Sequence, residues 1–292
     1  MSVFGLLNVH KPSGPTSHDI VAAVRRGTDV KKVGHAGTLD PMASGVLVLC
    51  LGPATRLSEY VMESRKTYRA RVRFGVETDT YDAEGTVIAE NDRPVTQEAV
   101  EGALAAFRGP IEQVPPMYSA IKQGGKKLYE LARAGQEVER PARSVTIYQI
   151  ELLAWAPPDA VLDVMCSPGT YIRSLAHDLG AAVGIGAHLA ALERTTSGPF
   201  TAVNAVEWAE LQAAMDADTW RDALLPPDMA LMDAPAVYLS PEDAGHVRHG
   251  RLIAATPDIH AAALARAYDP DGQFFAVLER REQHWKPGKV FV

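Results

Sequence analysis

The clearest alternation of apolar and polar side chains lies between residues 66 and 76. The apolar positions are Tyr68, Ala70, Val72, Phe74 and Val76, and the polar positions between them are Thr67, Arg69, Arg71 and Arg73. A period of two predicts a strand with one face on the core. The arginine face is open to two interpretations, the solvated side of an antiparallel sheet or a strip that meets phosphates. Tyr68 either packs in the core or presents its ring and hydroxyl to a cleft.

Apolar runs of strand length and apolar side chains at helical spacing extend this pattern along the chain. Further strands are predicted at 5–9, 43–51, 145–153, 160–166 and 194–200. Helices are predicted to begin with Ser17 as an N-cap, near Thr55, after Thr96 and at the Ser167–Thr170 block. Strands and helices therefore mix throughout the first two thirds of the chain.

Two segments depart from this pattern. Regular patterning weakens over residues 112–143, where six basic and four acidic residues surround Gly124-Gly125 and a short predicted helix at 128–134, so we interpret the segment as an excursion from the core. Pro226-Pro227 is a predicted hinge between the two parts of the chain. The last 60 or so residues, which come after it, combine short strands with the Asp269–Gly272 turn. They predict a small β-rich module.

Composition and charge narrow the class of protein. The chain has 292 residues, 47% of them apolar and 22% charged, and no apolar run approaches the roughly 20 residues of a membrane span, so we expect a cytoplasmic protein without membrane contact. Cys50 and Cys166 each lie inside an apolar run, which predicts core residues rather than a disulfide or a metal site.

The net charge of −7 is unevenly distributed. Residues 1–204 carry 21 basic and 22 acidic side chains, and residues 205–292 carry 8 and 14. Within 56–73, six basic residues face only Glu59 and Glu63. A local basic surface, suited to nucleic acid, therefore survives the acidic total.

Candidate chemistry centres on the stretch Gly34–Pro41, in which two glycines and a proline surround Asp40. A carboxylate presented on a rigid loop is a candidate nucleophile, although the same residue types also build an ordinary turn. Lys11 follows the first strand, where composition alone favours a solvated turn lysine. Asp79 and Asp82 fit no calcium loop and are interpreted as turn-forming aspartates. Tyr171 and Arg173 fall in the first turn of a predicted helix, where anionic groups are favoured.

Taken together, these blocks resemble the TruB family of tRNA pseudouridine synthases. The resemblance is carried by the motifs Leu7–Gly14, His35–Pro41, Lys66–Arg69, Cys166–Arg173 and Lys286–Phe291. It implies an α+β fold with a mixed, mainly antiparallel sheet flanked by helices, and a C-terminal barrel of the PUA type that binds RNA. It also implies a catalytic domain at 1–230 with a thumb-like insert at about 112–143, a PUA-like domain at 233–292, and a reaction at uridine 55 in the T loop of tRNA.

The resemblance also assigns roles to individual residues. It implies that Asp40 is the catalytic aspartate, that Tyr68 stacks on the target base and that Arg173 pairs with the aspartate. The expected substrate contacts are His35, Tyr171, Leu192, Lys11 and Arg56. Isomerising uridine breaks the bond from ribose to N1 and rejoins the base through C5 with no redox change, so we expect no cofactor and no metal. An arginine beside Asp40 favours the ionised carboxylate, and an inserted histidine with a receiving tyrosine ring offsets part of the cost of extruding the base.

Three functions compete at this point. An RNA isomerase is favoured. A non-catalytic RNA-binding protein of the same architecture would have lost Asp40 or Arg173, and both are present. An unrelated hydrolase would want a second acid near Asp40, and no motif supplies one. The expected partner is the T-arm stem-loop of tRNA, and the insert resembles that of stand-alone bacterial enzymes, which predicts a monomer that needs no guide RNA or protein partner.

Overall fold

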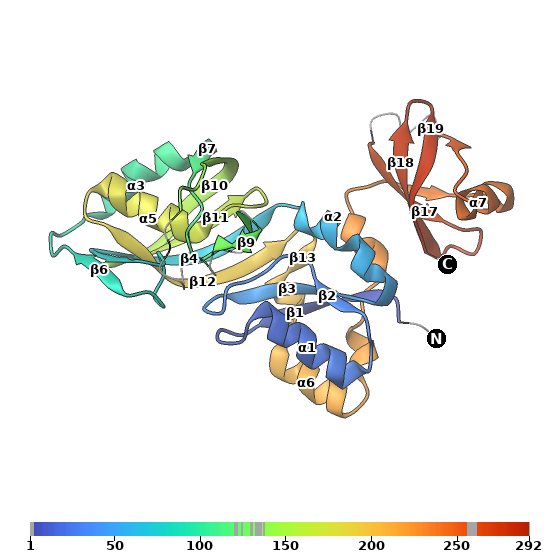
Figure 1. The fold of residues 1–292 in the computed structure, drawn as a ribbon, viewed down its shortest axis with the longest axis horizontal. Coiled ribbons are helices and arrows are strands. Elements are labelled where there is room, and N and C mark those ends of the chain that lie inside the picture. Colours follow the sequence, from blue (N-terminus) through green and yellow to red (C-terminus); the bar gives the residue numbers. More distant parts are fainter. Residues whose placement is uncertain are drawn as a thin grey trace.

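The structure is a computed structural model that describes residues 3–119, 122, 123, 125–128, 131, 136, 138–255 and 262–291. One large mixed sheet with helices packed against it occupies most of the chain, and the C-terminal residues form a second, smaller sheet (Figure 1). This is the α+β architecture that the sequence predicts.

The large sheet has the strand order β14-β1-β3-β12-β4-β11-β10-β7, with β2 paired to β3 and β13 paired to β12. Its strands are β1 (Gly5–Lys11), β2 (Val33–His35), β3 (Ser44–Leu51), β4 (Lys66–Phe74), β7 (Gly109–Gln113), β10 (Arg143–Ala156), β11 (Asp159–Cys166), β12 (Ala187–Ser197), β13 (Phe200–Thr201) and β14 (Val206–Glu207). The pairs β1–β14 and β3–β12 are parallel, and the other pairs are antiparallel. The expectation of a mixed, mainly antiparallel sheet is confirmed.

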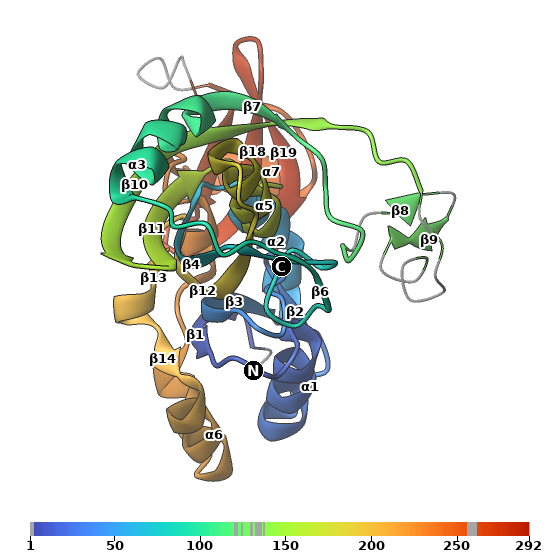
Figure 2. The same ribbon diagram turned by 90° about the vertical axis from the view of Figure 1, so that its left-hand side faces the viewer.

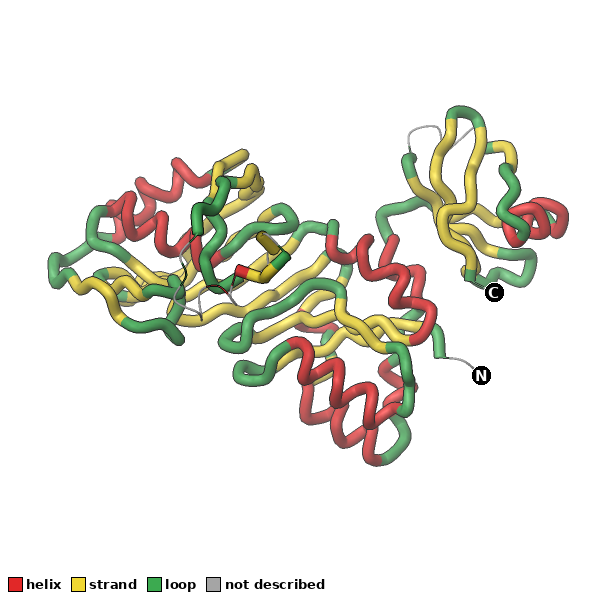
Figure 3. The backbone as a smooth tube through the Cα atoms, in the orientation of Figure 1, coloured by secondary structure: helices red, strands yellow, loops and turns green. Residues whose placement is uncertain are grey.

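The longer helices of this unit gather toward the two ends of the sheet (Figures 2 and 3). The helices of the large unit are α1 (Ser17–Thr28), η1 (Gly52–Leu57), α2 (Ser58–Met62), α3 (Gln97–Leu104), η2 (Ala105–Phe107), α5 (Ile172–Val183), η3 (Ala202–Asn204), α6 (Trp208–Asp216), η4 (Trp220–Ala223) and η5 (Pro227–Leu231). Helices α1 and α6 lie at one end, and α3 and α5 lie at the other. The site described below lies between these pairs.

Two of the predicted helix starts agree with the structure to within a residue. The helix predicted near Thr55 is instead divided into η1 and α2, and α5 begins at Ile172, just after the Ser167–Thr170 block. The N-cap of α1 is Thr16, whose hydroxyl and backbone form a capping box with Asp19, so Ser17 is the first helical residue instead of the expected cap. Thr96 caps α3 as predicted. Each cap satisfies a backbone N–H that the helix itself leaves without a partner.

Two apolar clusters hold the large sheet, one on each face. The first contains alternate residues of β1 and β3, including Leu7, Val9, Leu47 and Leu49, and packs against all four long helices. The second contains the residues between them on these strands, including Leu6, and packs against α2, η5 and part of the C-terminal module. Strands β1 and β3 are therefore buried on both faces, which explains why consecutive apolar residues occupy both faces of β3 and much of β1.

The predicted arginine strand is confirmed as β4, although Gly75 ends it two residues early with a φ of +83°. Its arginines point away from the helices, and acids of the neighbouring strand β11 accompany them. Arg73 Nε lies 2.7 Å from an Asp159 carboxylate oxygen and Arg71 Nε lies 4.0 Å from that carboxylate. The structure therefore favours the interpretation of a solvated sheet face, because Arg71 and Arg73 share the Asp159 carboxylate and Asp163 is the strand partner of Arg69.

Smaller differences from the sequence-based expectations have local reasons. Strand β12 runs unbroken over Ala187–Ser197, where the sequence suggested a strand beginning only at 194, because its bulges let apolar and polar residues share one face. The hairpin β5 (Val76–Thr78) and β6 (Val87–Glu90) and the pair β8 (Lys122–Gln123) and β9 (Lys126–Lys127) lie outside the large sheet. Most of the helix predicted at 128–134 lies outside the described residues.

The C-terminal residues form a curled five-stranded sheet with the order β15-β17-β18-β19-β16. Its elements are β15 (Ala236–Tyr238), α7 (Pro241–Arg248), β16 (Ile253–Ala254), β17 (Leu264–Tyr268), β18 (Phe274–Arg281) and β19 (His284–Val290). It has its own apolar core around Trp285 and Phe275. The predicted β-rich module is therefore a half-barrel sheet in the structure.

Polar and aromatic contacts tie this module to the large unit beside α2 (Figure 1). Arg56 donates a hydrogen bond of 2.8 Å to the carbonyl of Val290 and lies over the ring of Phe291, and Lys289 forms an ion pair with Glu59. Among the described helices, none is both long and apolar enough to span a bilayer.

Candidate active site

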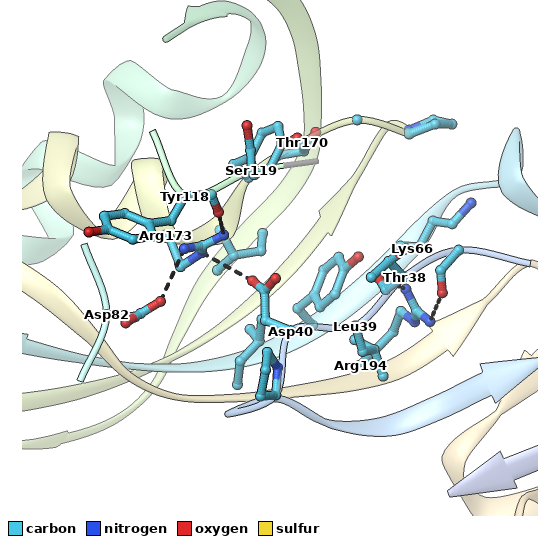
Figure 4. A pocket seen from close by; sticks show the side chains of 18 of the residues that line it. Thr38, Leu39, Asp40, Lys66, Asp82, Tyr118, Ser119, Thr170, Arg173 and Arg194 are labelled. Carbon is cyan, nitrogen blue, oxygen red and sulfur yellow. Dashed lines mark hydrogen bonds and ion pairs between the residues drawn. The ribbon is translucent and has the colours of Figure 1, made fainter. Parts of the chain in front are cut away.

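A pocket of about 700 Å³ opens in the middle of the large sheet, between the loop that follows β2 and the N-terminus of α5 (Figure 4). Five of the residues expected at the site line it: Asp40, Tyr68, Tyr171, Arg173 and Leu192. These residues come from β4, α5, β12 and the 36–43 loop, so only the folded chain brings them together. Apolar walls with a few convergent charged groups are typical of a small-molecule or nucleotide site.

The loop that carries Asp40 is held from both sides by hydrogen bonds to its backbone. Ser17, at the start of α1, donates its hydroxyl to the carbonyl of Leu39 and accepts a hydrogen bond from the N–H of Leu39, at 2.9 and 2.8 Å. The buried Arg194 of β12 donates to the carbonyls of Gly37 at 2.9 Å and Thr38 at 3.3 Å. Asp40 therefore stands on a fixed backbone, as a positioned catalytic group requires.

Arg194 was not singled out by the sequence, because its neighbours predicted only a core strand. Its approach depends on Gly45, the second residue of β3. A Cβ atom at Gly45 would lie 2.3 Å from the backbone oxygen of Arg194, and Gly45 has a φ of +97°. Any side chain there would separate β3 from β12 and carry Arg194 away from the loop.

Lys11 overturns the interpretation of a solvated turn lysine. Its side chain is fully buried, and Nζ donates to the carbonyls of Pro12, Pro15 and Pro41 at 2.8, 2.8 and 3.3 Å. Burial lowers the pKa of Lys11 to about 8, and Asp40 acts in the opposite direction. Within the described part of the chain, the carbonyl oxygens of these three prolines accept no hydrogen bond within a strand or a helix. Lys11 donates hydrogen bonds to them in place of such partners. Its place is beneath the loop and outside the pocket lining.

Arg173 is the centre of the polar part of the pocket (Figure 4). Its Nε lies 3.0 Å from Oδ2 of Asp40, its Nη1 lies 3.1 Å from Oδ2 of Asp82, and its Nη2 donates to the carbonyl of Tyr118 at 2.8 Å. The side chain is only 5% exposed. The start of α5 is fixed by Gln113, whose side-chain amide exchanges hydrogen bonds of 2.9 and 2.7 Å with the backbone of Tyr171.

Asp82 is the residue that sequence reasoning misjudged most. It does shape a turn, since Oδ1 accepts from the hydroxyl of Thr80 at 2.6 Å and from the N–H of Glu84 at 3.1 Å, but it is also buried and paired with Arg173. A second acid therefore lies near Asp40, although no sequence motif predicted one. No local signal reveals it, because the pairing crosses 91 residues of sequence.

The electrostatics of Asp40 are a balance between burial and arginine. The pocket walls partly desolvate the carboxyl and raise its pKa above the ordinary value, and the negative charge of Asp82 adds to this effect. Arg173 opposes it most strongly, followed by Lys11 and Arg194. Arg173 therefore favours the ionised form of Asp40, which is the direction expected of an arginine beside this carboxylate.

Tyr68 begins the apolar face of β4 and lines the pocket. Burial raises the pKa of its phenol above the ordinary value, while Arg194 acts against the shift. A neutral hydroxyl beside a pocket donates hydrogen bonds, and the ring offers a flat face for stacking. The interpretation as a cleft residue is thus favoured over a plain core position.

The lining formed by the described residues lacks three of the expected contacts, Lys11, His35 and Arg56. His35 lies on β2 beside the ring of His18, with centroids 6.3 Å apart, and burial lowers the pKa of its imidazole. Arg56 contacts the end of the C-terminal module, as described above. Among the described residues, no group of three or more histidine, cysteine, aspartate or glutamate side chains is arranged to hold a metal ion.

Two solved structures contain chains that share this fold. The chain aligns over 99% of its length with a chain in the "Structure of H/ACA RNP bound to a substrate RNA containing 2'-deoxyuridine", at 26% identity, a TM-score of 0.77 and 85% coverage of that chain. It aligns with a chain of a Cbf5-Nop10-Gar1 complex at 28% identity and a TM-score of 0.78, again covering 99% and 85%.

Sequence comparison gives the family. The model described as TruB family pseudouridylate synthase (N terminal domain) matches residues 25–172, tRNA pseudouridylate synthase B C-terminal domain matches 173–232, and tRNA Pseudouridine synthase II, C terminal, matches 235–292. These matches define the class of the protein, an RNA isomerase that converts uridine to pseudouridine. The chain belongs to the TruB family.

Three relatives carry the name tRNA pseudouridine synthase B. The protein of Symbiobacterium thermophilum is 54% identical over 85% of this chain and 82% of its own length. The protein of Pseudomonas aeruginosa is 44% identical, covering 95% and 92%, and that of Burkholderia pseudomallei is 46% identical, covering 99% and 97%.

Proposed function

We propose that this protein isomerises uridine 55 in the T loop of tRNA to pseudouridine, with Asp40 as the nucleophile. The observation that carries the proposal is the ion pair of 3.0 Å between Arg173 and Asp40 at the floor of the pocket. The relatives named above as tRNA pseudouridine synthase B supply the substrate class. Position 55 and the T loop come from the resemblance of the sequence motifs.

The reaction needs one group that attacks and one place for the base to turn. The bond from ribose C1′ to N1 breaks, a bond from C1′ to C5 forms, and the proton of C5 is exchanged for one on N1, so the atoms balance without a cofactor or metal. Asp40 supplies the charged carboxylate in this scheme. Its 39% exposed side chain faces the pocket, so a reacting nucleotide can reach it.

The target base must leave its stacked loop to enter the pocket. A volume of about 700 Å³ admits a nucleotide, and the Tyr68 ring lies in its wall as a stacking partner for the extruded base. Leu192 and Tyr171 complete an apolar surround. Extrusion costs a few kcal/mol, and stacking on an aromatic ring recovers about 1–3 kcal/mol of it.

The competing functions fit the geometry less well. A hydrolase would use the second acid to activate water, but both carboxylate oxygens of Asp82 are occupied by protein partners and its side chain is 5% exposed. A purely RNA-binding protein has no need for a carboxylate pair around a buried arginine. The polar centre of the pocket is therefore better explained by catalysis.

The parts of the chain around the pocket suggest how the hairpin is held. We assign the catalytic domain to 1–230, the grip on the T-arm stem-loop to the thumb-like insert at about 112–143, and contacts outside the T arm to a PUA-like domain at 233–292. The base of the insert is fixed to α5 through Gln113 and Tyr118, so a hairpin held there lies over the pocket. The protein acts as a monomer without guide RNA or a protein partner.

Incubation with a T-arm hairpin tests the proposal. Pseudouridine at the position of uridine 55, mapped by chemical labelling, is the expected product, and a hairpin with cytidine at that position serves as the matched control. Turnover of the hairpin by the protein alone supports the stand-alone mode. Absence of pseudouridine from both the hairpin and full-length tRNA would overturn the assignment of substrate.

A further inference from the structure

The turn that carries Asp82 contains a strained residue. Tyr81 has a φ of +65°, a left-handed conformation that a bulky side chain rarely adopts because it is sterically strained. Its two neighbours both contact Arg173. The carbonyl of Thr80 accepts from Nη1 at 3.4 Å, and the carboxylate of Asp82 lies 3.1 Å from the same atom.

The ring of Tyr81 stacks on a side chain of α5. It lies parallel to the imidazole of His177, with centroids 4.0 Å apart and an interplanar angle of 27°. His177 is four residues after Arg173, which places both on the same face of α5. Helix α5 therefore holds this turn at two successive helical turns, once through the charges of Arg173 and once through the ring of His177.

The backbone of the turn is tight and leaves little choice of conformation. The N–H of Tyr81 donates to Thr78 at 3.2 Å, and its carbonyl accepts from Leu189 of β12 at 3.0 Å. A Cβ atom at Gly85 would lie 2.2 Å from the hydroxyl oxygen of Thr80. Strain in a close-packed turn persists only where surrounding contacts compensate it, and the stack on His177 is such a contact.

We infer that Tyr81 is a positioning residue, whose stack on His177 holds Asp82 against Arg173 and so fixes the guanidinium that pairs with Asp40. Tyr81 is absent from the described residues that line the pocket, so it acts through Asp82 without touching substrate. A guanidinium that turns about its side chain changes its distance to Asp40 by a large part of an ångström, and catalysis is sensitive to shifts of this size. The inference rests on the proposed function for its rate measurement.

Matched variants separate the ring from the backbone strain. Tyr81→Asn removes the ring but keeps a residue that tolerates the left-handed conformation, and His177→Ala removes the stacking partner. Tyr81→Phe and His177→Phe retain a stacked ring, and the second also removes the imidazole contacts to Asp178 and Glu77. We expect the first two to lower kcat on the hairpin about three- to tenfold, with KM within about twofold, and the Phe variants to remain near wild type.

The double variant Tyr81→Asn/His177→Ala gives the decisive result. If the two rings act as one device, it loses no more kcat than the worse single variant. If the double variant lost kcat by the product of the two single losses, the residues would act independently and the inference would be overturned. A lower melting temperature with unchanged kcat would show that they only stabilise the fold, and would also overturn it.

A second measurement does not depend on turnover. The Nε–H signal of the buried Arg173 in nuclear magnetic resonance spectra should exchange slowly with solvent in the wild type and the Phe variants, and faster in Tyr81→Asn. Equal exchange rates would overturn the inference by themselves. Wild-type protein that forms no pseudouridine would refute the proposed function, and the Arg173 signal would still decide the role of Tyr81.

Discussion

Arg173 and Asp40 lie 133 residues apart in sequence, and their Nε and Oδ2 atoms are 3.0 Å apart in the structure. The arginine reaches this position because Gln113 fixes the start of α5, and the aspartate because Ser17 and Arg194 fix its loop. Both partners of the pair are thus held by other elements. This preorganisation explains how a partly desolvated carboxyl remains available in its charged form.

Replacing Asp40 by asparagine tests the role of the charge. The amide is nearly isosteric, so Asp40→Asn should keep the loop and bind the hairpin within about twofold of wild type. Turnover should fall below detection, because the amide lacks the charge that attack requires. Pseudouridine mapping and filter binding give the two results, and glutamate at the same position is the control for charge without geometry. Appreciable pseudouridine from Asp40→Asn, with deamidation excluded, would contradict the mechanism.

The two partners of Asp40 should move the acid limb of the pH–rate profile in opposite directions. Activity falls as the pH drops through the pKa of the Asp40 carboxyl, because the ionised form reacts. Arg173 lowers that pKa, so Arg173→Ala should move the limb to higher pH. Asp82 raises the pKa of Asp40, so Asp82→Asn should move the acid limb to lower pH. The same variant holds Arg173 less firmly, so the maximal rate should fall about tenfold or more. Measuring kcat/KM against pH gives both results, with Arg173→Lys as an intermediate case because the ammonium keeps the charge but loses the planar fork. If Arg173→Ala and Asp82→Asn moved the acid limb in the same direction, the opposing effects of Arg173 and Asp82 on the pKa of Asp40 would be refuted.

Tyr68→Phe should separate stacking from hydrogen bonding. Burial raises the pKa of the Tyr68 phenol, so its hydroxyl remains protonated at neutral pH and acts as a donor. The phenylalanine ring stacks equally well, so hairpin affinity should be unchanged while kcat falls about a hundredfold. Single-turnover rates and filter binding measure the two effects. A loss of kcat below about threefold would leave stacking as the whole role of this side chain.

Lys11→Met should destabilise the protein with little effect on the chemistry. Methionine fills a similar volume but removes the donor to the carbonyls of Pro12 and Pro15, whereas Pro41 keeps a hydrogen bond from the N–H of Gly14. Each buried group left unsatisfied costs about 1–3 kcal/mol. The free energy of unfolding in urea measures the loss. Lys31→Met, at an exposed lysine, is the matched control and should remain within about 0.5 kcal/mol of wild type. Equal stability of the two variants would restore the solvated interpretation of Lys11.

Arg56→Ala should reveal whether this arginine serves the substrate or the C-terminal module. The guanidinium contacts Val290 and Phe291, so its loss should lower the melting temperature by a few degrees through a looser module. The KM for the T-arm hairpin should change by less than about twofold, because the contacts of Arg56 lie away from the pocket lining. A several-fold rise in KM with unchanged melting temperature would instead identify a direct RNA contact, as the sequence-based expectation holds.

Local sequence determined the elements. Alternation over 66–74 and apolar runs at 5–9 and 44–51 specify strands, because side chains that alternate or are apolar throughout leave the backbone only one way to bury them. Motif resemblance then determined the family and singled out Asp40, Tyr68 and Arg173, which line one pocket in the structure. These features depend on neighbours in the chain, so the chain itself displays them.

The tertiary structure alone decided the contacts between charges. Lys11 and Asp82 look like turn residues in the sequence, yet one is buried under three carbonyls and the other holds Arg173 across 91 residues. Tyr81 looks like a loop tyrosine until its ring meets His177. A buried charge is tolerated only when partners from other elements compensate its desolvation, and no local pattern records which elements the fold will bring together.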